Sequence, residues 1–141
     1  RRGSMAGTLT GAQTKLVGML TGRLNAFSYS CQDVVVRIRV LKGPQIRVDL
    51  SGDAPQIDVA LSLRVLATDR FPKREVIQRQ MLDELNEVTA ICQRLSVDPF
   101  NYALYAASQF LTTRAWLDYA WQERFPQAQV SYQLSFSESQ T

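Results

Sequence analysis

Three neighbouring segments with alternating apolar and polar residues constrain the fold of this chain more than any other feature. They cover residues 34–41, 46–50 and 57–65, and every second residue in each is Val, Ile or Leu. This two-residue period is that of a β-strand with one buried face. Two clusters of turn-forming residues separate the segments, Lys42–Pro44 and Ser51–Pro55. The pattern predicts an antiparallel meander of three strands, packed on one face and polar on the other.

The period lengthens to three and four residues after the meander. It predicts a long amphipathic helix over residues 73–95, with Pro72 near its start and an apolar stripe of Ile77, Met81, Leu85, Val88, Cys92 and Leu95. A further helix is expected to open with Asp98 as N-cap and Pro99 as its first helical residue, and to bury Phe100, Leu104, Ala107 and Leu111. A last turn or helix carries Trp116 to Trp121 and ends at Phe125, because Pro126 disfavours helix at the preceding residue.

The two ends of the chain complete the expected order of elements. A short helix is predicted within residues 9–24, with Thr10 as N-cap and Gly22 as its stop. A closing strand is predicted over residues 130–136, and its direction relative to its neighbour is left open. Residues 1–5 are interpreted as an expression scar and residues 138–141 as a disordered tail. The fold class is α+β: one domain over residues 6–137, with an antiparallel-rich mixed sheet of about four strands packed on one face by several helices.

The composition excludes several classes of function. Among 141 residues there is no histidine, which excludes Ser-His-Asp and Cys-His nucleophiles and the usual histidine-containing zinc sites. Two cysteines cannot form a four-cysteine zinc site; a Cys31–Cys92 disulfide is left open, for an extracytoplasmic protein only. No glycine-rich phosphate loop or nucleophile elbow is present. We therefore predict no enzyme, catalytic residue, cofactor or metal, and expect Asp83, Glu84 and Glu87 to face water.

Two groups of residues are candidates for an interaction surface. Arg37, Arg39, Arg47 and Arg64 fall on the polar side of the predicted meander. They form either an anion-binding stripe or cross-strand ion pairs on a wet face. The net charge of +3 and the lack of interleaved aromatic residues favour ion pairs. The second group belongs to an aromatic-rich segment that packs mainly in the core, in which exposed members would mark a partner surface: Tyr102, Tyr105, Trp116 and Trp121.

Three stretches of the chain together resemble a known family. Residues 15–20 read KLVGML ahead of the predicted sheet. The helix over residues 82–95 is followed by Val97–Phe100, and Trp121–Pro126 precedes the closing strand. In this order and spacing the sequence resembles the C-terminal domain of the C subunit of bacterial spore germinant receptors, the Ger(x)C lipoprotein family.

The resemblance implies a location and a role. Members are lipid-anchored on the outer face of the spore inner membrane through an N-terminal cysteine, which would lie upstream, so that neither Cys31 nor Cys92 is that residue. They work with two membrane-embedded partner subunits in nutrient sensing, and no catalytic residue is carried over. We therefore expect a non-catalytic domain that acts by protein–protein contacts. The alternative is a cytosolic anion- or nucleic-acid-binding domain that uses the arginine-bearing sheet face.

Overall fold

The computed structural model describes residues 10–66 and 73–137 of the chain. The expectations for residues 1–5, Pro72 and residues 138–141 lie outside these ranges. The elements follow one another as α1 (Gly11–Leu20), β1 (Ala26–Cys31), β2 (Val34–Asp49), β3 (Gln56–Leu66), α2 (Arg74–Arg94), α3 (Tyr102–Ala107), α4 (Thr113–Tyr119), α5 (Trp121–Arg124), the 3₁₀ helix η2 (Phe125–Gln127) and β4 (Gln129–Ser137). This is the predicted α+β class.

The four strands form one mixed sheet in the order β1-β2-β3-β4. The first three strands pair antiparallel, whereas β4 pairs parallel to β3. A meander was predicted, but its first two predicted segments form the single strand β2. The connection between β3 and β4 contains the helices α2 to α5, which return the chain to the end of the sheet from which β3 starts. The parallel pairing resolves the direction that the sequence left open.

The meander begins one strand earlier than the sequence predicted. Strand β1 buries Phe27, Tyr29 and Cys31, while serines occupy the intervening positions 28 and 30. A two-residue turn joins it to β2, and both Gln32 and Asp33 have positive φ angles, of 53° and 65°. Turns of this kind match the twist of the two strands they connect.

Strand β2 runs without interruption through the predicted turn at Lys42–Pro44, so that prediction was wrong. The register shifts there twice: Val40 faces Leu63, Lys42 faces Ser62 and Gln45 faces Ala60. Two extra residues on β2 are thereby absorbed as bulges. Because β1 pairs with β2 only as far as Arg39, Pro44 lies on a free edge, where its missing N–H group costs no ladder hydrogen bond. The second predicted turn, at Ser51–Pro55, is present.

The first two helices follow the predictions closely. Helix α1 begins after Thr10, whose hydroxyl accepts a hydrogen bond from the Gln13 N–H at 3.0 Å, and the Gln13 side chain accepts one from the Thr10 N–H. This reciprocal pair is a capping box. The chain leaves α1 at Gly22, which has a φ of +80°. Helix α2 lies within one residue of its predicted bounds and buries Ile77, Met81, Leu85, Val88 and Cys92.

The third helix begins later than predicted. Asp98 caps it from a distance: its carboxylate accepts hydrogen bonds from the N–H groups of Tyr102 at 3.1 Å and Ala103 at 2.8 Å. The short α3 turns Tyr102 and Ala106 inward. The predicted buried stripe is therefore wrong beyond Phe100: Leu104 is 67% exposed and Leu111, past the end of the helix, is fully exposed. The predicted element carrying Trp116 and Trp121 is divided between α4 and α5 at Ala120. Phe125 keeps helical angles, with φ of −57° and ψ of −40°, and continues into η2, so the helical chain does not end at the residue before Pro126 as predicted.

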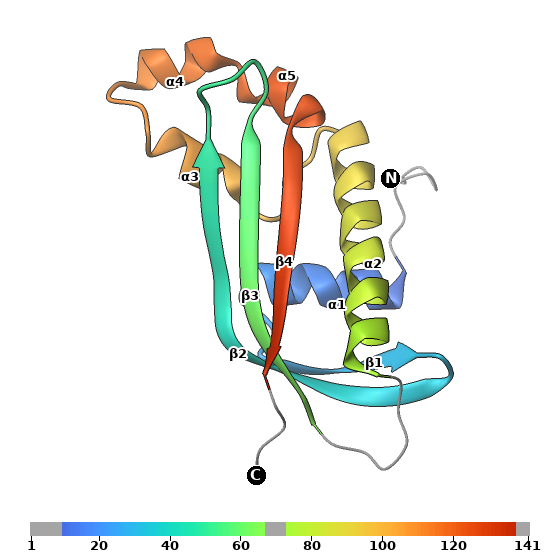
Figure 1. The fold of residues 1–141 in the computed structure, drawn as a ribbon. Coiled ribbons are helices and arrows are strands. Elements are labelled where there is room, and N and C mark those ends of the chain that lie inside the picture. The colour runs from blue at the N-terminus through green and yellow to red at the C-terminus, as the bar shows by residue number, and fades with distance from the viewer. Residues whose placement is uncertain (1–9, 67–72, 138–141) are drawn as a thin grey trace.

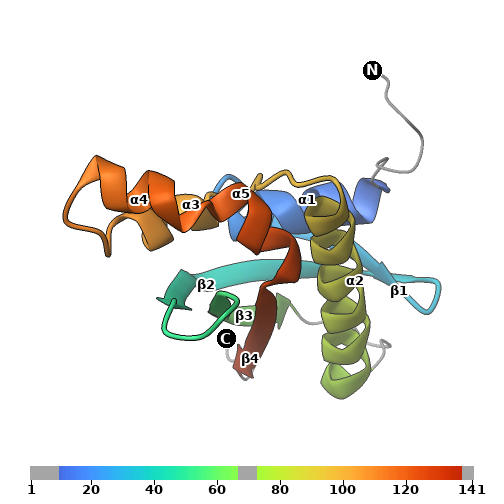
Figure 2. The same ribbon diagram turned by 90° about the horizontal axis from the view of Figure 1, so that it is seen from above.

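The helices cover one face of the sheet and leave the other open. Figures 1 and 2 show α1, α3, α4 and α5 on the same side of the sheet, with α2 running beside β4. The core lies between the helices and the inward-facing side chains of the strands, which include Ile38, Ile57, Leu63 and Leu134. Burial of this apolar area is the main stabilising term for a domain of this kind.

Long polar side chains from the helices cap backbone carbonyls of both outer strands. At β1, Lys15 donates to the Ser28 carbonyl and Gln80 to the Ser30 carbonyl, both at 2.9 Å. At β4, Gln78 donates to the Leu134 carbonyl at 2.7 Å and Arg74 to the Ser137 carbonyl at 3.0 Å. Such capping blunts an edge that would otherwise pair with another strand. The edge of β2 beyond Arg39 has no partner in β1.

Candidate interaction surface

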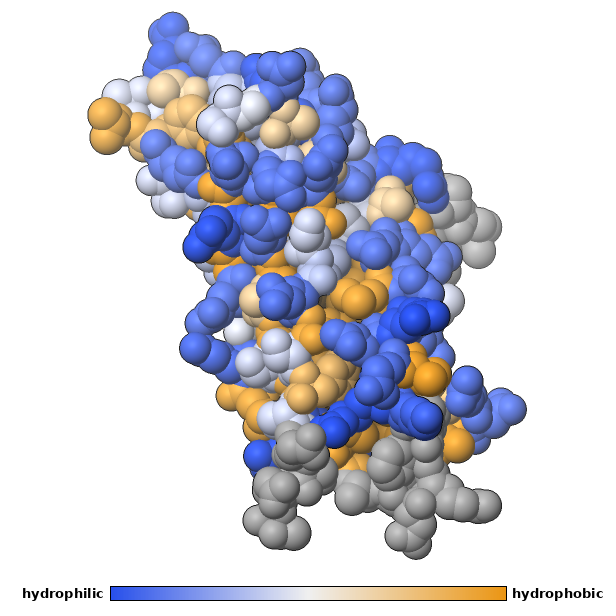
Figure 3. Space-filling model, in the orientation of Figure 1, coloured by the Kyte–Doolittle hydropathy of each residue, from blue (hydrophilic) through white to orange (hydrophobic). Residues whose placement is uncertain are grey.

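The helix-free face of the sheet, here called the outer face, is built by the polar half of the strand alternation. On β3 the residues from Ile57 to Val65 at odd positions are buried, so the even positions point outward. Their partners across the ladder extend this side onto β2 and β4. The outer face consists of Arg37, Arg39, Lys42, Gln45, Arg47, Asp49, Gln56, Asp58, Ala60, Ser62, Arg64, Ser131, Gln133, Ser135 and Ser137. Figure 3 shows hydrophilic residues spread over this side of the molecule, with apolar ones between them.

The four arginines predicted to share this face do so, but not as one stripe. Arg39 lies directly opposite Arg64, and Arg37 lies two residues away on the same strand. Arg47 lies opposite Asp58 instead. Six residues of β3 separate Asp58 from Arg64, or roughly 20 Å at the rise of an extended strand. The bulges in β2 set this spacing, and they could not be read from the alternation.

A cluster of positive charge occupies one end of the outer face. We call Arg37, Arg39, Lys42 and Arg64 the basic cluster. Arg37 donates a hydrogen bond to the Ser28 hydroxyl at 3.2 Å. Within residues 10–66 and 73–137, none of the four forms an ion pair with a carboxylate. The cross-strand ion pairs that the sequence favoured are therefore not made in this cluster.

Two buried polar atoms border the basic cluster. The Nε atom of Arg64 is buried and has no hydrogen-bond partner in the described part of the chain, and the same holds for the Oγ atom of Ser137. Arg64 and Ser137 are partners across the parallel β3–β4 ladder. Buried polar groups normally have a hydrogen-bond partner, because a buried donor or acceptor without one costs about 1–3 kcal/mol. An acceptor that reached these atoms after a movement of the Arg64 side chain would therefore gain from hydrogen bonding to them.

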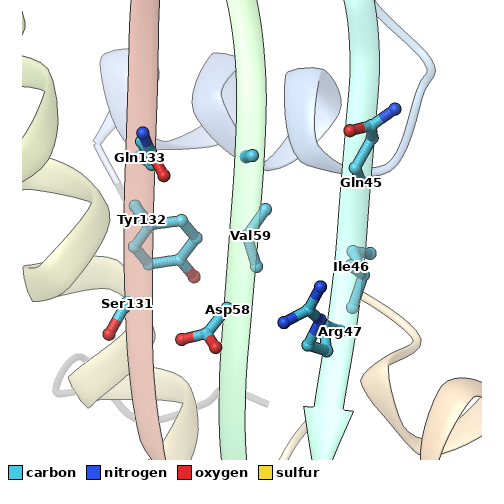
Figure 4. Close-up of a pocket in the computed structure, with 9 residues that line it drawn as sticks. Gln45, Ile46, Arg47, Asp58, Val59, Ser131, Tyr132 and Gln133 are labelled. Atoms are coloured by element: carbon cyan, nitrogen blue, oxygen red, sulfur yellow. The ribbon is translucent and has the colours of Figure 1, made fainter.

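A shallow polar trough lies at the other end of the outer face. It is lined by Gln45, Arg47, Asp58, Ala60, Ser131 and Gln133, from three strands. Figure 4 shows the Arg47 side chain directed toward Asp58, with Ser131 and Gln133 on the neighbouring strand. Ala60 leaves room at the centre, because its side chain is a single methyl group. The trough offers amide and hydroxyl groups and one balanced pair of opposite charges.

The second candidate surface is a projecting arm made by α3, α4 and the turn between them. Its exposed apolar residues are Leu104 at 67%, Tyr105 at 43%, Leu111 at 100% and Leu117 at 66%. An aromatic contact at its base ties the arm to α5: the rings of Trp116 and Trp121 lie 5.9 Å apart. Single exposed leucines are common, but several together on one projection are typical of a contact surface.

The four aromatic residues selected from the sequence divide between the core and the surface. Tyr102 is fully buried and Trp121 is 7% exposed, because α3 and α5 turn these side chains toward the sheet. The structure thus corrects their placement on a surface. Tyr105 is exposed, and Trp116 is partly buried against the core. The exposed leucines beside them were missed, because helical spacing assigned Leu104 and Leu111 to the interior.

Buried tyrosines form hydrogen-bonded networks beneath the sheet. The Tyr132 hydroxyl lies 2.6 Å from the Thr89 hydroxyl and 3.0 Å from the Tyr102 hydroxyl. Burial raises the pKa of Tyr132 to about 12. Tyr29 donates to the Glu84 carboxylate at 2.5 Å, and burial, followed by this hydrogen bond, raises the pKa of Tyr29. These groups stay protonated at neutral pH and serve packing.

The acidic residues and cysteines carry no reactive arrangement in the described chain. Asp83 and Glu87 face water as expected, whereas Glu84 is half-buried by its contact with Tyr29. Cys31 and Cys92 are free and buried, so the open question of a disulfide is answered by two separate thiols. Burial raises the pKa of both thiols, which disfavours the reactive thiolate.

The described residues contain neither a candidate metal site nor a candidate membrane-spanning helix. Residues 10–66 and 73–137 contain no group of three or more side chains that could hold a metal ion. Within the same ranges, no helix is both long enough and apolar enough to span a membrane.

Comparison with known proteins gives a family and a fold. The family model described as "Spore germination B3/GerAC like, C-terminal" matches residues 1–137. No curated protein matches this chain. Among solved structures, the crystal structure of the GerBC protein is similar to this one, with a TM-score of 0.72 at 14% sequence identity. The match covers 94% of this chain but 46% of the GerBC chain, so this chain spans less than half of that protein's length. At this identity the likeness concerns the fold.

Proposed function

This chain belongs to the GerAC-like C-terminal family of spore germination proteins, and from that membership we propose that it is the C-terminal domain of a germinant-receptor C subunit. In this role the domain performs no catalysis. It binds membrane-embedded partner subunits and so couples nutrient sensing to them. A lipid anchor in an upstream part of the protein holds it at the outer face of the spore inner membrane.

The open outer face is the observation that carries this proposal. Helices cover one side of the sheet, and the other side exposes a basic cluster whose charges are uncompensated within the described residues. A face of this kind is suited to a partner, since charge complementarity guides protein association. The projecting arm offers a second contact area, with Leu111 and Leu117 as apolar anchors.

Co-purification from spore membranes tests the proposal with the full-length protein. Two double variants change the two surfaces separately: Arg39→Glu with Arg64→Glu on the outer face, and Leu111→Ser with Leu117→Ser on the arm. Arg79→Glu, at an exposed position of α2, is the matched control. We expect at least one double variant to lower the recovery of partner subunits several-fold and to slow nutrient-triggered germination, with Arg79→Glu matching the wild type.

Retention of the partner subunits by both double variants would contradict the proposal. If both double variants retain the partner subunits and germinate at the wild-type rate, the domain does not act through these surfaces and the proposal fails. Folding is checked separately by the circular dichroism spectrum and the unfolding midpoint of each purified domain. All four substituted positions are solvent-accessible or partly so, and changes at such positions are usually well tolerated.

A further inference from the structure

We propose that the basic cluster is a receptor site for a short acidic segment of a partner protein, with Arg39 and Arg64 binding one carboxylate between them. This inference rests on the proposed function, because the partner is then a receptor subunit. It goes further in assigning the chemistry of the contact: Asp or Glu side chains on an extended or looped segment.

The pairing of Arg39 with Arg64 is the first argument. These residues are directly opposite each other in the antiparallel β2–β3 ladder. Like charges in this arrangement destabilise a sheet, and here no carboxylate of the described residues offsets them. Two guanidinium groups side by side are well suited to a carboxylate, which accepts two parallel hydrogen bonds from each arginine fork. An acidic side chain would relieve the repulsion and satisfy both groups.

The buried polar atoms at the border of the cluster are the second argument. Among the residues that the structure describes, none accepts a hydrogen bond from Arg64 Nε–H, which points along the guanidinium plane. Ser137 Oγ, next to it across the ladder, also lacks a partner. Both atoms are buried, so a carboxylate bound to the terminal guanidinium nitrogens of Arg64 reaches them only after the Arg64 side chain shifts. Such a shift would give both atoms an acceptor and so favours the bound state.

The surroundings of the cluster limit the length of the ligand. Toward the trough the charge is no longer uniformly positive, because Asp58 and Asp49 accompany Arg47 on the same face. A polyanion with evenly spaced phosphates would meet these carboxylates as it continued along the strands. The outer face also carries no aromatic side chain on which bases could stack. A short acidic peptide segment satisfies the cluster without meeting Asp58, which favours a protein over a nucleic acid.

The segment meets the basic cluster on the outer face, where the four basic side chains lie. Side chains of α1 and α2 bind backbone carbonyls of β1 and β4, which blunts the addition of a further strand. Contact through side chains on the outer face remains available, because no helix covers it. The recognition is therefore by charge and hydrogen bonding of side chains.

A nuclear magnetic resonance titration of the purified chain tests this inference. The probe is a capped ten-residue peptide that alternates Glu and Ser, compared with the same peptide carrying Gln in place of Glu. We expect the acidic peptide to shift the Arg64 Nε–Hε resonance and the amide resonances of Arg37, Arg39 and Ser137. Arg39→Glu with Arg64→Glu should weaken the binding at least tenfold, whereas Arg47→Glu, on the same face beyond the cluster, should change it less than twofold.

Two comparison ligands separate the alternatives. One is a single-stranded oligonucleotide of ten nucleotides, and the other is a vesicle containing phosphatidylglycerol. If either binds the cluster more tightly than the acidic peptide, the assignment to a protein segment is overturned. Absence of binding by all three ligands at low ionic strength also overturns it, and so does equal binding of the Glu and Gln peptides.

The peptide titration and the spore experiment together distinguish failure of the carboxylate assignment from failure of the proposed function. If the arginine double variant loses partner subunits in spores but the acidic peptide does not bind, the receptor role stands and the carboxylate assignment fails. If the peptide binds the cluster but the double variant keeps its partners and germination, the site is real and its assignment to a receptor contact fails.

Discussion

Arg39 and Arg64 face each other across two antiparallel strands without a carboxylate of the described residues to separate their charges. This arrangement lowers the stability of the isolated domain, since like charges directly opposite each other repel. A group kept at a cost to stability is typical of a binding site. The pair therefore allows a stability measurement to test the assignment of function.

Replacing Arg39 by Gln should stabilise the isolated domain. The substitution removes the repulsion with Arg64, and we expect the free energy of unfolding to rise by about 0.2–1 kcal/mol at low salt. The gain should shrink at high salt, where the repulsion is already screened. Urea unfolding at two ionic strengths measures both effects. Arg47→Gln is the control, because Arg47 faces Asp58 and its loss should not stabilise; a lower stability of Arg39→Gln would contradict the prediction.

Alkaline pH should destabilise the domain from about pH 10 upward. Burial raises the pKa of Tyr132 to about 12 in the folded state, from an ordinary value of 10.0. The unfolded chain therefore releases this proton first, so the contribution is fully present below pH 10 and is lost as the pH rises toward 12. The expected loss is about 1 kcal/mol per pH unit for each such tyrosine. Urea unfolding between pH 8 and 11 measures the slope.

Tyr132→Phe serves as the matched variant for the alkaline effect. It keeps the ring but removes the ionisable hydroxyl. The loss of unfolding free energy per pH unit above pH 10 should therefore fall by the contribution of one tyrosine. The variant also loses the hydrogen bonds to Thr89 and Tyr102 and should be less stable at pH 7, by about 1–3 kcal/mol. An unchanged slope would show that Tyr132 is not held protonated by the fold.

Gln93 joins α2 to the segment that leads into β4. Its side-chain amide donates to the carbonyls of Phe125 at 2.9 Å and Ala128 at 2.8 Å. Gln93→Leu keeps the bulk but leaves both carbonyls without this donor, and we expect a loss of about 1–3 kcal/mol in thermal or chemical unfolding. Gln109→Leu, which removes one such bond to Val48, should cost less. Equal stability of Gln93→Leu and the wild type would mean that water replaces both bonds.

Ala120 connects α4 to α5 in a left-handed conformation, with φ of 61° and ψ of 60°. Glycine adopts this region without steric cost, so Ala120→Gly should stabilise the domain by about 1 kcal/mol. Ala115→Gly is the control, because Ala115 lies in the interior of α4, where glycine costs about 0.5–1 kcal/mol relative to alanine. Differential scanning calorimetry should therefore show melting temperatures that move in opposite directions. Two shifts of the same sign would contradict the assignment.

The sequence predicted those elements whose apolar period is long and uninterrupted. Helix α2 and strands β3 and β4 lie close to their expected bounds, because each has at least four periodic apolar residues. Strand β1 was missed since serines occupy its outer positions and the Gln32–Asp33 turn lacks glycine. The Lys42–Pro44 segment was misassigned because a free edge tolerates residues that otherwise end a strand.

The composition of the basic cluster was predicted only in part, because Lys42 was assigned to a turn and Arg47 lies beyond the cluster. The alternation assigned Arg37, Arg39, Arg47 and Arg64 to one face of the sheet, and that is where they lie. Their pairing depends on two bulges that shift the register of β2 against β3, and no local pattern specifies such a shift. The exposure of Leu104 was also missed. Its helix, α3, has six residues and is too short for the spacing of apolar residues to define a buried side.

The parallel pairing of β3 with β4 also bears on how the domain folds. Ile57 pairs with Val130, so forming this ladder brings together residues separated by 73 positions along the chain (130 − 57). The hairpins β1–β2 and β2–β3 close through turns of a few residues and can form early. Long-range pairing has to overcome a larger loss of chain entropy, and it slows folding. Docking of β4 should therefore be the late, rate-limiting event, and until it occurs the apolar side of β3 has no neighbour on that edge.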